Sequence, residues 1–301
     1  MHQQQQPVIR AERFGTAAEG QAATGAQTGT ARTRTRLARL KPALWFLLAC
    51  AAIYLLAVWT PAGQSAENSL IVGFGYGMPA WLYDWSQSIG PPPLTPRGEK
   101  ATIVVGIVLI VAVALVRRCW REGCAAVGTV VATVLVTEAL SKHLLPRPNL
   151  VNASHNFVEA SFPSGHVAMV AGLALGAVLV SSPRTRPYVA AAGALWLAFT
   201  AAAVQALYWH RPSDVLGATL LACAAYATAT ALLTPTASGT TRRLRALPPL
   251  ALAATGALLA GARDDSLAGP LVFAAAAFLC SVLLWNTATG KALRPMPRRE
   301  Q

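Results

Sequence analysis

Eight apolar runs, separated by short polar segments, constrain the fold of this chain more than any other feature. A helix needs about 20 apolar residues to cross a bilayer, and several of the runs approach that length. Only 12% of the residues are charged, which is about half the fraction usual in a soluble domain. Because backbone in lipid must satisfy its own hydrogen bonds, we expect an all-α integral membrane protein. The runs are Ala43–Thr60, Ala101–Val116, Cys124–Leu140, Val167–Val180, Tyr188–Ala206, Val215–Leu233, Leu247–Ala260 and Pro270–Trp285.

Basic residues are distributed unevenly between the two sides that these runs define. With the N-terminus in the cytoplasm, all but six of the 25 lysines and arginines fall in cytoplasmic segments. This bias follows the positive-inside rule, so the net charge of +13 reports topology and does not indicate nucleic-acid binding. We expect a multi-pass cell-membrane protein with both termini in the cytoplasm. The six basic residues on the outer side are Arg97, Lys100, Lys142, Arg147, Arg211 and Arg263.

Composition divides the chain into three parts. Residues 1–40 lack apolar periodicity and are predicted to form a disordered basic cytoplasmic tail. Residues 41–233 contain six of the runs and form the predicted core. Residues 234–301 add two further transmembrane helices, for packing or dimerisation, and a short basic tail. Asp264 and Asp265 between those helices are interpreted as solvated acids, and the aromatic stretch within residues 61–100 as an outer interfacial segment.

Three polar clusters interrupt the apolar pattern, and ionisable groups beside membrane spans are candidates for function. The first is SKHLLPRPNL, residues 141–150, the second is PSGH, residues 163–166, and the third is HRPSD, residues 210–214. The segment from His166 to His210 has the length of one helix inward, a turn and one helix back. We therefore expect all three clusters on the outer side of the membrane.

Residues in the first two clusters suit the binding of a phosphate. Lys142 and Arg147 match the charge of phosphate oxygens, and Arg adds a bidentate fork. Ser164 and Gly165 stand at a predicted helix start, where free backbone N–H groups favour an anion. Glu138, four residues before Lys142, is expected to pair with that lysine.

The two histidines suit phosphoryl transfer. His210 and Asp214 are four residues apart, so on a helix the carboxylate can fix one ring nitrogen and leave the other as a nucleophile. His166, on the other side of the bound anion, can act as a general acid. This chemistry requires no metal and no other cofactor, since Lys and Arg can stabilise the charge.

The order of these motifs resembles that of the type 2 phosphatidic acid phosphatase (PAP2) superfamily, in particular its membrane lipid phosphate phosphatases with six core helices. The resemblance covers about residues 101–233. It implies that His210 is the nucleophile, that Asp214 orients it and that His166 protonates the leaving group. The residues that it implies hold the phosphate are Lys142, Arg147, Ser164 and Gly165.

Two positions depart from the family pattern. The family usually places six residues between the Lys and the Arg-Pro of its first motif, whereas four separate Lys142 from Arg147. It also usually places an Arg six residues before the nucleophile, and Val204 occupies that position. We hypothesise that Arg211 replaces the lost charge. A headgroup contact by Arg211, or a weak or non-hydrolytic member of the family, are the alternatives.

Together these features predict a membrane phosphatase that acts at the extracytoplasmic face on a lipid phosphate or diphosphate. Phosphatidic acid, phosphatidylglycerol phosphate and polyprenyl diphosphate are candidate substrates. A phosphotransferase of the same fold and a non-catalytic phospholipid-binding membrane protein are the alternatives. The expected partners are the lipid substrate and membrane lipids, with a homo-oligomer left open and no nucleic acid. The Ala- and Arg-rich composition is typical of a GC-rich bacterium.

Overall fold

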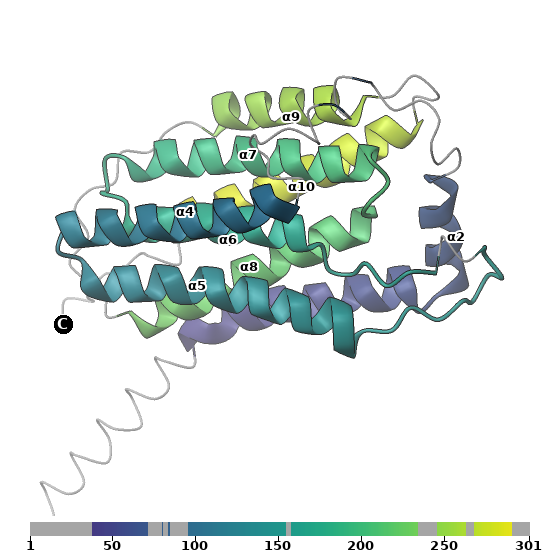
Figure 1. The fold of residues 1–301 in the computed structure, drawn as a ribbon, viewed down its shortest axis with the longest axis horizontal. Helices are drawn as coiled ribbons and strands as arrows, with labels where there is room; N and C mark the ends of the chain where they lie inside the picture. Colours follow the sequence, from purple (N-terminus) through teal and green to yellow (C-terminus); the bar gives the residue numbers. More distant parts are fainter. Residues whose placement is uncertain are drawn as a thin grey trace, which may run out of the picture.

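The computed structural model describes residues 38–71, 96–154, 158–233, 246–262 and 268–290, together with Ala80 and Asp84. Within these ranges every regular element is a helix and no strand occurs, so the predicted all-α class is confirmed. The long helices lie side by side along one common direction (Figure 1). The predicted N-terminal tail up to residue 37, most of the aromatic outer segment, and Asp264 and Asp265 lie outside the described residues.

Among the described residues, six helices are long and apolar enough to cross a membrane, and two shorter apolar helices, α6 and α9, lie among them. Each of the eight predicted runs falls largely within one helix. The chain is therefore a multi-pass membrane protein. In chain order the lengthwise helices are the first helix (Ala38–Val58), α4 (Pro96–Val116), α5 (Trp120–Ala139), α6 (Gly165–Val180), α7 (Arg186–Ala206), α8 (Pro212–Leu232), α9 (Leu247–Gly261) and α10 (Ala268–Thr289).

Helix α6 lies at the centre of the bundle and packs against α4, α5, α7 and α8. Its 16 residues span only about 24 Å, less than the hydrocarbon core of a bilayer at about 30 Å. Its side chains are nearly all buried by protein, so its length need not match the thickness of the lipid. Small residues permit the close packing: a Cβ on Gly193 of α7 would lie 2.7 Å from the Cβ of Ala174 on α6.

The last two helices, α9 and α10, pack directly against the other helices of the bundle. Both contact α7, and α10 also contacts α8. The hydroxyl of Ser281 on α10 donates to the carbonyl of Ala194 at 2.8 Å, and the side-chain amide of Gln205 donates to the carbonyl of Phe273 at 3.3 Å. Since Gln205 lies in the last turn of α7, α10 supports the turn that leads to His210.

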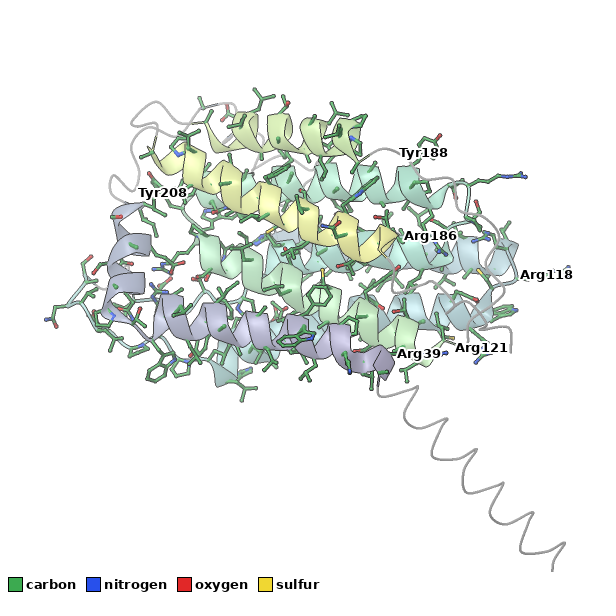
Figure 2. All side chains as sticks on the ribbon, turned by 180° about the vertical axis from the view of Figure 1, so that it is seen from behind. Arg39, Arg118, Arg121, Arg186, Tyr188 and Tyr208 are labelled. Atoms are coloured by element: carbon green, nitrogen blue, oxygen red, sulfur yellow. The ribbon has the colours of Figure 1, made fainter. Side chains whose placement is uncertain are left out.

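The two ends of the bundle differ in character. Arg39, Arg118, Arg121 and Arg186 gather toward one end, and Tyr208 lies at the other (Figure 2). Helix directions bring the three polar clusters to the end that contains Tyr208, which we call the site end. The short helix α2 (Pro61–Ser69) lies crosswise at this end (Figure 1). It begins at the N-cap Thr60, whose hydroxyl accepts from the backbone N–H of Gly63 at 3.0 Å.

Candidate active site

The turn after α7 places His210 at the site end. The backbone N–H of Tyr208 donates to the carbonyl of Gln205, and that of Trp209 donates to the carbonyl of Val204. These two bonds form a Schellman motif, in which Tyr208 takes the left-handed conformation with φ of 57°. The N–H of His210 also donates to the carbonyl of Val204, at 3.2 Å. Val204 is the position at which the family usually carries an arginine, and it is fully buried here.

His210 and Asp214 come together, although not on one face of a helix as the sequence spacing suggested. Helix α8 begins at Pro212, with Arg211 as its N-cap, so His210 precedes the helix. Asp214 is the third helical residue, and its carboxylate reaches back over the N-terminus. Its Oδ2 accepts from the backbone N–H of Arg211 at 2.9 Å and lies 3.5 Å from Nδ1 of His210.

A hydrogen-bonded chain fixes the Asp214 carboxylate. The hydroxyl of Ser161 donates to Oδ2 of Asp214 at 2.6 Å and accepts from Nη1 of Arg211 at 2.9 Å. Asp214 is fully buried. Because this carboxylate faces Nδ1 of His210, Nε2 is the nitrogen left to react with a ligand. Sequence reasoning missed Ser161, although it stands two residues before the proline of the PSGH motif.

His166 lies beside His210, as the topology predicted. Its ring centre is 5.8 Å from that of His210 and 5.6 Å from that of Trp209. His166 is the second residue of α6, and the N-cap Ser164 accepts from the backbone N–H of Val167 at 3.4 Å. The backbone N–H of Ser164 donates to the carbonyl of Asp214 at 3.1 Å. This bond joins the start of α6 to α8 and holds the two histidines at one level.

Ser164 and Gly165 differ in their access to a ligand. Ser164 is fully buried, and its oxygen caps the helix. A Cβ added to Gly165 would meet only Oε1 of Glu99, at 4.0 Å, so the space beside this glycine is open. The backbone N–H of Gly165 is thus the better placed of the two for an anion, while phosphate binding by either residue stays a prediction.

The loop that carries Arg147 is tied to the first helix and to α2. The hydroxyl of Tyr54 donates to the carbonyl of Pro146 at 2.7 Å. Gln64, buried in α2, donates to the carbonyl of Pro148 at 2.6 Å and accepts from the backbone N–H of Leu150 at 3.2 Å. Both residues of this anchorage, Tyr54 and Gln64, precede the segment in which the motifs lie.

Glu67 is the counterion of Arg147, and no motif in the sequence predicted this role. Both side chains are buried, with Nη1 of Arg147 3.6 Å from Oε2 of Glu67. The other oxygen of Glu67 accepts from the backbone N–H of Ser213 at 3.1 Å. Burial raises the pKa of Glu67, and the charge of Asp214 adds to that effect, against the opposing pull of Ser213 and Arg147. Glu67 therefore links the loop of Arg147 to the start of α8.

Arg211 belongs to the same buried group of charges. Burial lowers the pKa of its guanidinium, and the positive charge of Arg147 adds to this, while Asp214 and Glu67 oppose it. Arg211 stays protonated because guanidinium pKa values begin far above neutrality. Its closeness to Arg147 agrees with the replacement hypothesis without testing it. Arg147 and Arg211 are the positive members of this buried group, and Glu67 and Asp214 are its negative members.

Lys142 lies at the rim of the site and not within the buried group. It sits in a π-helical turn, Leu140–Leu144, that continues α5. Its side chain is 62% exposed and is ion-paired with Glu138, as predicted. Glu99, in the first turn of α4, interacts electrostatically with Glu138, Lys142 and His210, and sequence reasoning missed it. Among the residues that the structure describes, no three His, Cys, Asp or Glu side chains come together as a metal site requires.

Comparison with known proteins supports the assignment of these motifs. Residues 122–239 match the model of the PAP2 superfamily. The match runs from the first turn of α5 to beyond α8, and it leaves out α2, α4, α9 and α10. A search of curated proteins and a search of solved structures each gave no match to the chain. The resemblance inferred from the motifs is thus confirmed for the superfamily, and residues 122–239 form a PAP2 superfamily domain within a multi-pass membrane protein.

Proposed function

We propose that the protein is a membrane phosphatase that removes a phosphoryl group from a lipid phosphate or diphosphate. One observation carries the proposal: two imidazole rings, from His166 and His210, lie 5.8 Å apart, and a fixed carboxylate faces the second. The PAP2 domain supports phosphoester hydrolysis in general. The membrane-spanning helices favour a lipid as the bearer of the phosphate.

The first step is attack by Nε2 of His210 on phosphorus. Asp214 holds the ring through Nδ1 and stabilises the positive charge that forms on the imidazole. The bond from phosphorus to the lipid oxygen breaks, and protonated His166 donates its proton to that oxygen. This leaves the phosphoryl group on His210 and the neutral His166 beside it.

In the second step water attacks the phosphohistidine. His166 accepts a proton from the water as the new P–O bond forms, and the N–P bond to His210 breaks. Inorganic phosphate leaves, and both histidines return to their starting states. Lys142, Arg147 and the N–H groups at the start of α6 stabilise the charge on the phosphoryl oxygens.

The membrane orientation belongs to the same proposal. Arginines gather at the end of the bundle opposite the site, and the positive-inside rule assigns that end to the cytoplasm (Figure 2). The site then faces the extracytoplasmic surface, at the level of the lipid headgroups.

Phosphate release by the purified protein tests this function. Wild type should release phosphate from at least one of phosphatidic acid, phosphatidylglycerol phosphate and a polyprenyl diphosphate. His210→Ala should abolish release from the same lipid. Phosphate that appears only when an acceptor lipid or sugar is added, or appears on that acceptor, would identify a transferase instead. Equal release by wild type and His210→Ala would end the proposal.

A further inference from the structure

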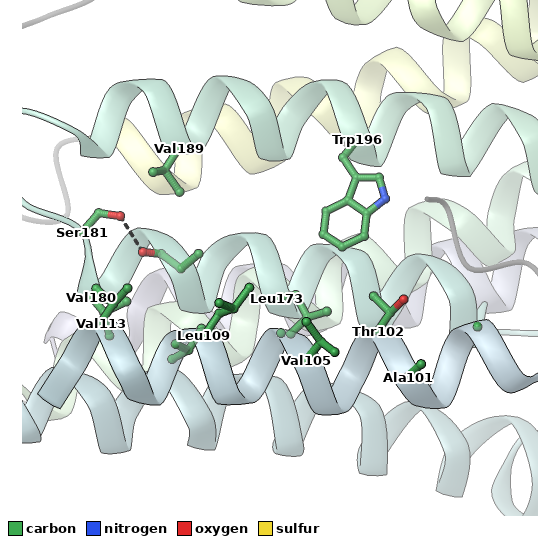
Figure 3. A pocket seen from close by; sticks show the side chains of 14 residues that line it. Ala101, Thr102, Val105, Leu109, Val113, Leu173, Val180, Ser181, Val189 and Trp196 are labelled. Atoms are coloured by element: carbon green, nitrogen blue, oxygen red, sulfur yellow. Dashed lines mark hydrogen bonds between the residues drawn. The ribbon is translucent and has the colours of Figure 1, made fainter. Parts of the chain in front are cut away.

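An apolar groove of about 560 Å³ lies between α4, α6 and α7 (Figure 3). This volume falls in the range of sites that hold small organic molecules. On α4 the lining residues recur every fourth position, so they form one continuous face. The ring of Trp196 points from α7 toward that face (Figure 3). The walls of the groove include Ala101, Val105, Leu109 and Val113 of α4, Leu173 of α6 and Trp196 of α7.

One end of the groove adjoins the candidate active site. Gly98 and Ala101 line the groove, and Glu99 stands between them in sequence. The carboxylate of Glu99 lies 4.0 Å from the position that a Cβ on Gly165 would take. Glu99 also interacts electrostatically with His210. A molecule in this end of the groove is therefore within about one helical turn of the proposed phosphate position.

The groove is long, lined almost entirely by apolar side chains, and open to the side. Ala101 and Val113 are twelve residues apart on one helix, so the groove runs for about 18 Å. That length exceeds half of a hydrocarbon core about 30 Å thick. Val105 and Leu109 are 56% and 60% exposed, on a helix that faces lipid. A hydrocarbon chain can thus enter from the bilayer and extend past its midplane.

We propose that this groove binds one hydrocarbon chain of the phosphate-bearing substrate and so makes the enzyme prefer a long chain. The proposal rests on the proposed function, because it assigns the phosphate of the same molecule to the histidine pair. Transfer of a chain from lipid to an equally apolar groove gains little from the hydrophobic effect. The gain comes from packing and from alignment of the phosphate with His210.

Two tryptophan variants on neighbouring residues test the groove. Val105→Trp fills it, whereas Val104→Trp places the same ring on a neighbouring position that is 60% exposed and does not line it. The assay measures phosphate release from a hexadecyl lipid phosphate and from a soluble butyl phosphate. We expect Val105→Trp to lower kcat/KM for the hexadecyl substrate about tenfold and to leave the butyl substrate unchanged. Val104→Trp should leave both unchanged.

The proposal would be overturned if Val105→Trp and Val104→Trp changed kcat/KM equally. It would also be overturned if Val105→Trp lowered kcat/KM equally for both substrates. A bulk membrane lipid in the groove would give the former result. A photocrosslinking measurement separates this failure from failure of the proposed function. A diazirine at the chain end of the hexadecyl phosphate should label α4 and α7, less in Val105→Trp, and the matching alcohol should not compete. If wild type releases no phosphate but labels in this manner, the groove stands and the hydrolase is refuted; without such labelling the groove is refuted as well.

Discussion

Removal of the Glu67 carboxylate should displace Arg147 and weaken phosphate binding. The two side chains are buried and 3.6 Å apart. At an effective dielectric constant of about 20, Coulomb's law gives about 5 kcal/mol for this separation, and desolvation of both groups offsets part of it. Breaking a buried pair by removing one partner costs about 3–5 kcal/mol. Glu67→Ala also leaves the backbone N–H of Ser213 without its acceptor, at a further cost of about 1–3 kcal/mol.

A two-variant comparison measures this coupling. Glu67→Gln keeps an acceptor for Ser213 and loses the charge, so it isolates the pair with Arg147. If about 1.4 kcal/mol of the loss reaches the phosphate site, KM for the lipid phosphate rises about tenfold. Glu67→Ala should raise KM further and lower the unfolding temperature in detergent. Glu122→Gln, in the first turn of α5 at the opposite end of the bundle, is the matched control.

The pH dependence of this effect has a definite sign. Burial raises the pKa of Glu67, so its carboxylate is lost at a higher pH than that of an exposed glutamate. Above that raised pKa, wild type should therefore have a lower KM than Glu67→Gln. As the pH falls through the pKa, the KM of wild type should rise toward that of Glu67→Gln. Identical KM values for wild type, Glu67→Gln and Glu67→Ala across the pH range would refute the role assigned to Glu67.

Three further substitutions test other contacts of the site. Ser161→Ala removes a hydrogen bond to Asp214 and should lower kcat by about tenfold, with little change in KM, because the carboxylate loses its orientation; equal values in wild type would contradict this. Gly165→Ala should fold normally, since its Cβ meets nothing closer than 4.0 Å, yet bind inorganic phosphate more weakly because the methyl group occupies the open space. Arg211→Ala should raise KM more than Arg211→Lys does, and retention of wild-type affinity by both would refute the replacement of the missing arginine.

The sequence predicted the helices and the meeting of the two histidines for a simple reason. Apolar runs of membrane length give the number and direction of helices, and the directions bring His166 and His210 to one end. The Glu138–Lys142 pair also follows from spacing alone. Local geometry was harder to predict: His210 precedes α8 because Arg211 and Pro212 begin the helix there. His210 and Asp214 do meet, as their spacing predicted, but the carboxylate reaches His210 across the N-terminus of α8 and not along one face of a helix.

The contacts that come from distant segments were beyond sequence reasoning. Glu67 meets Arg147 and Ser213 across more than 70 residues, and no periodicity or motif in α2 points to either partner. The same holds for Gln64 and for Glu99, since packing of whole helices sets their neighbours. Lys142 and Arg147 were predicted as one phosphate-binding pair, but the structure places the first at the exposed rim and the second in the buried group.

Detection of a phosphoryl group on a single histidine tests the central claim most directly. His166 acts in both steps, so His166→Ala is incubated with a radiolabelled aryl phosphate, whose leaving group needs no proton. The second step then limits turnover, and alkaline quench followed by mass spectrometry should find the label on His210. His210→Ala treated in the same way should carry none. Label on another residue, or phosphate release by wild type with no labelled His210 in either protein, would contradict the account.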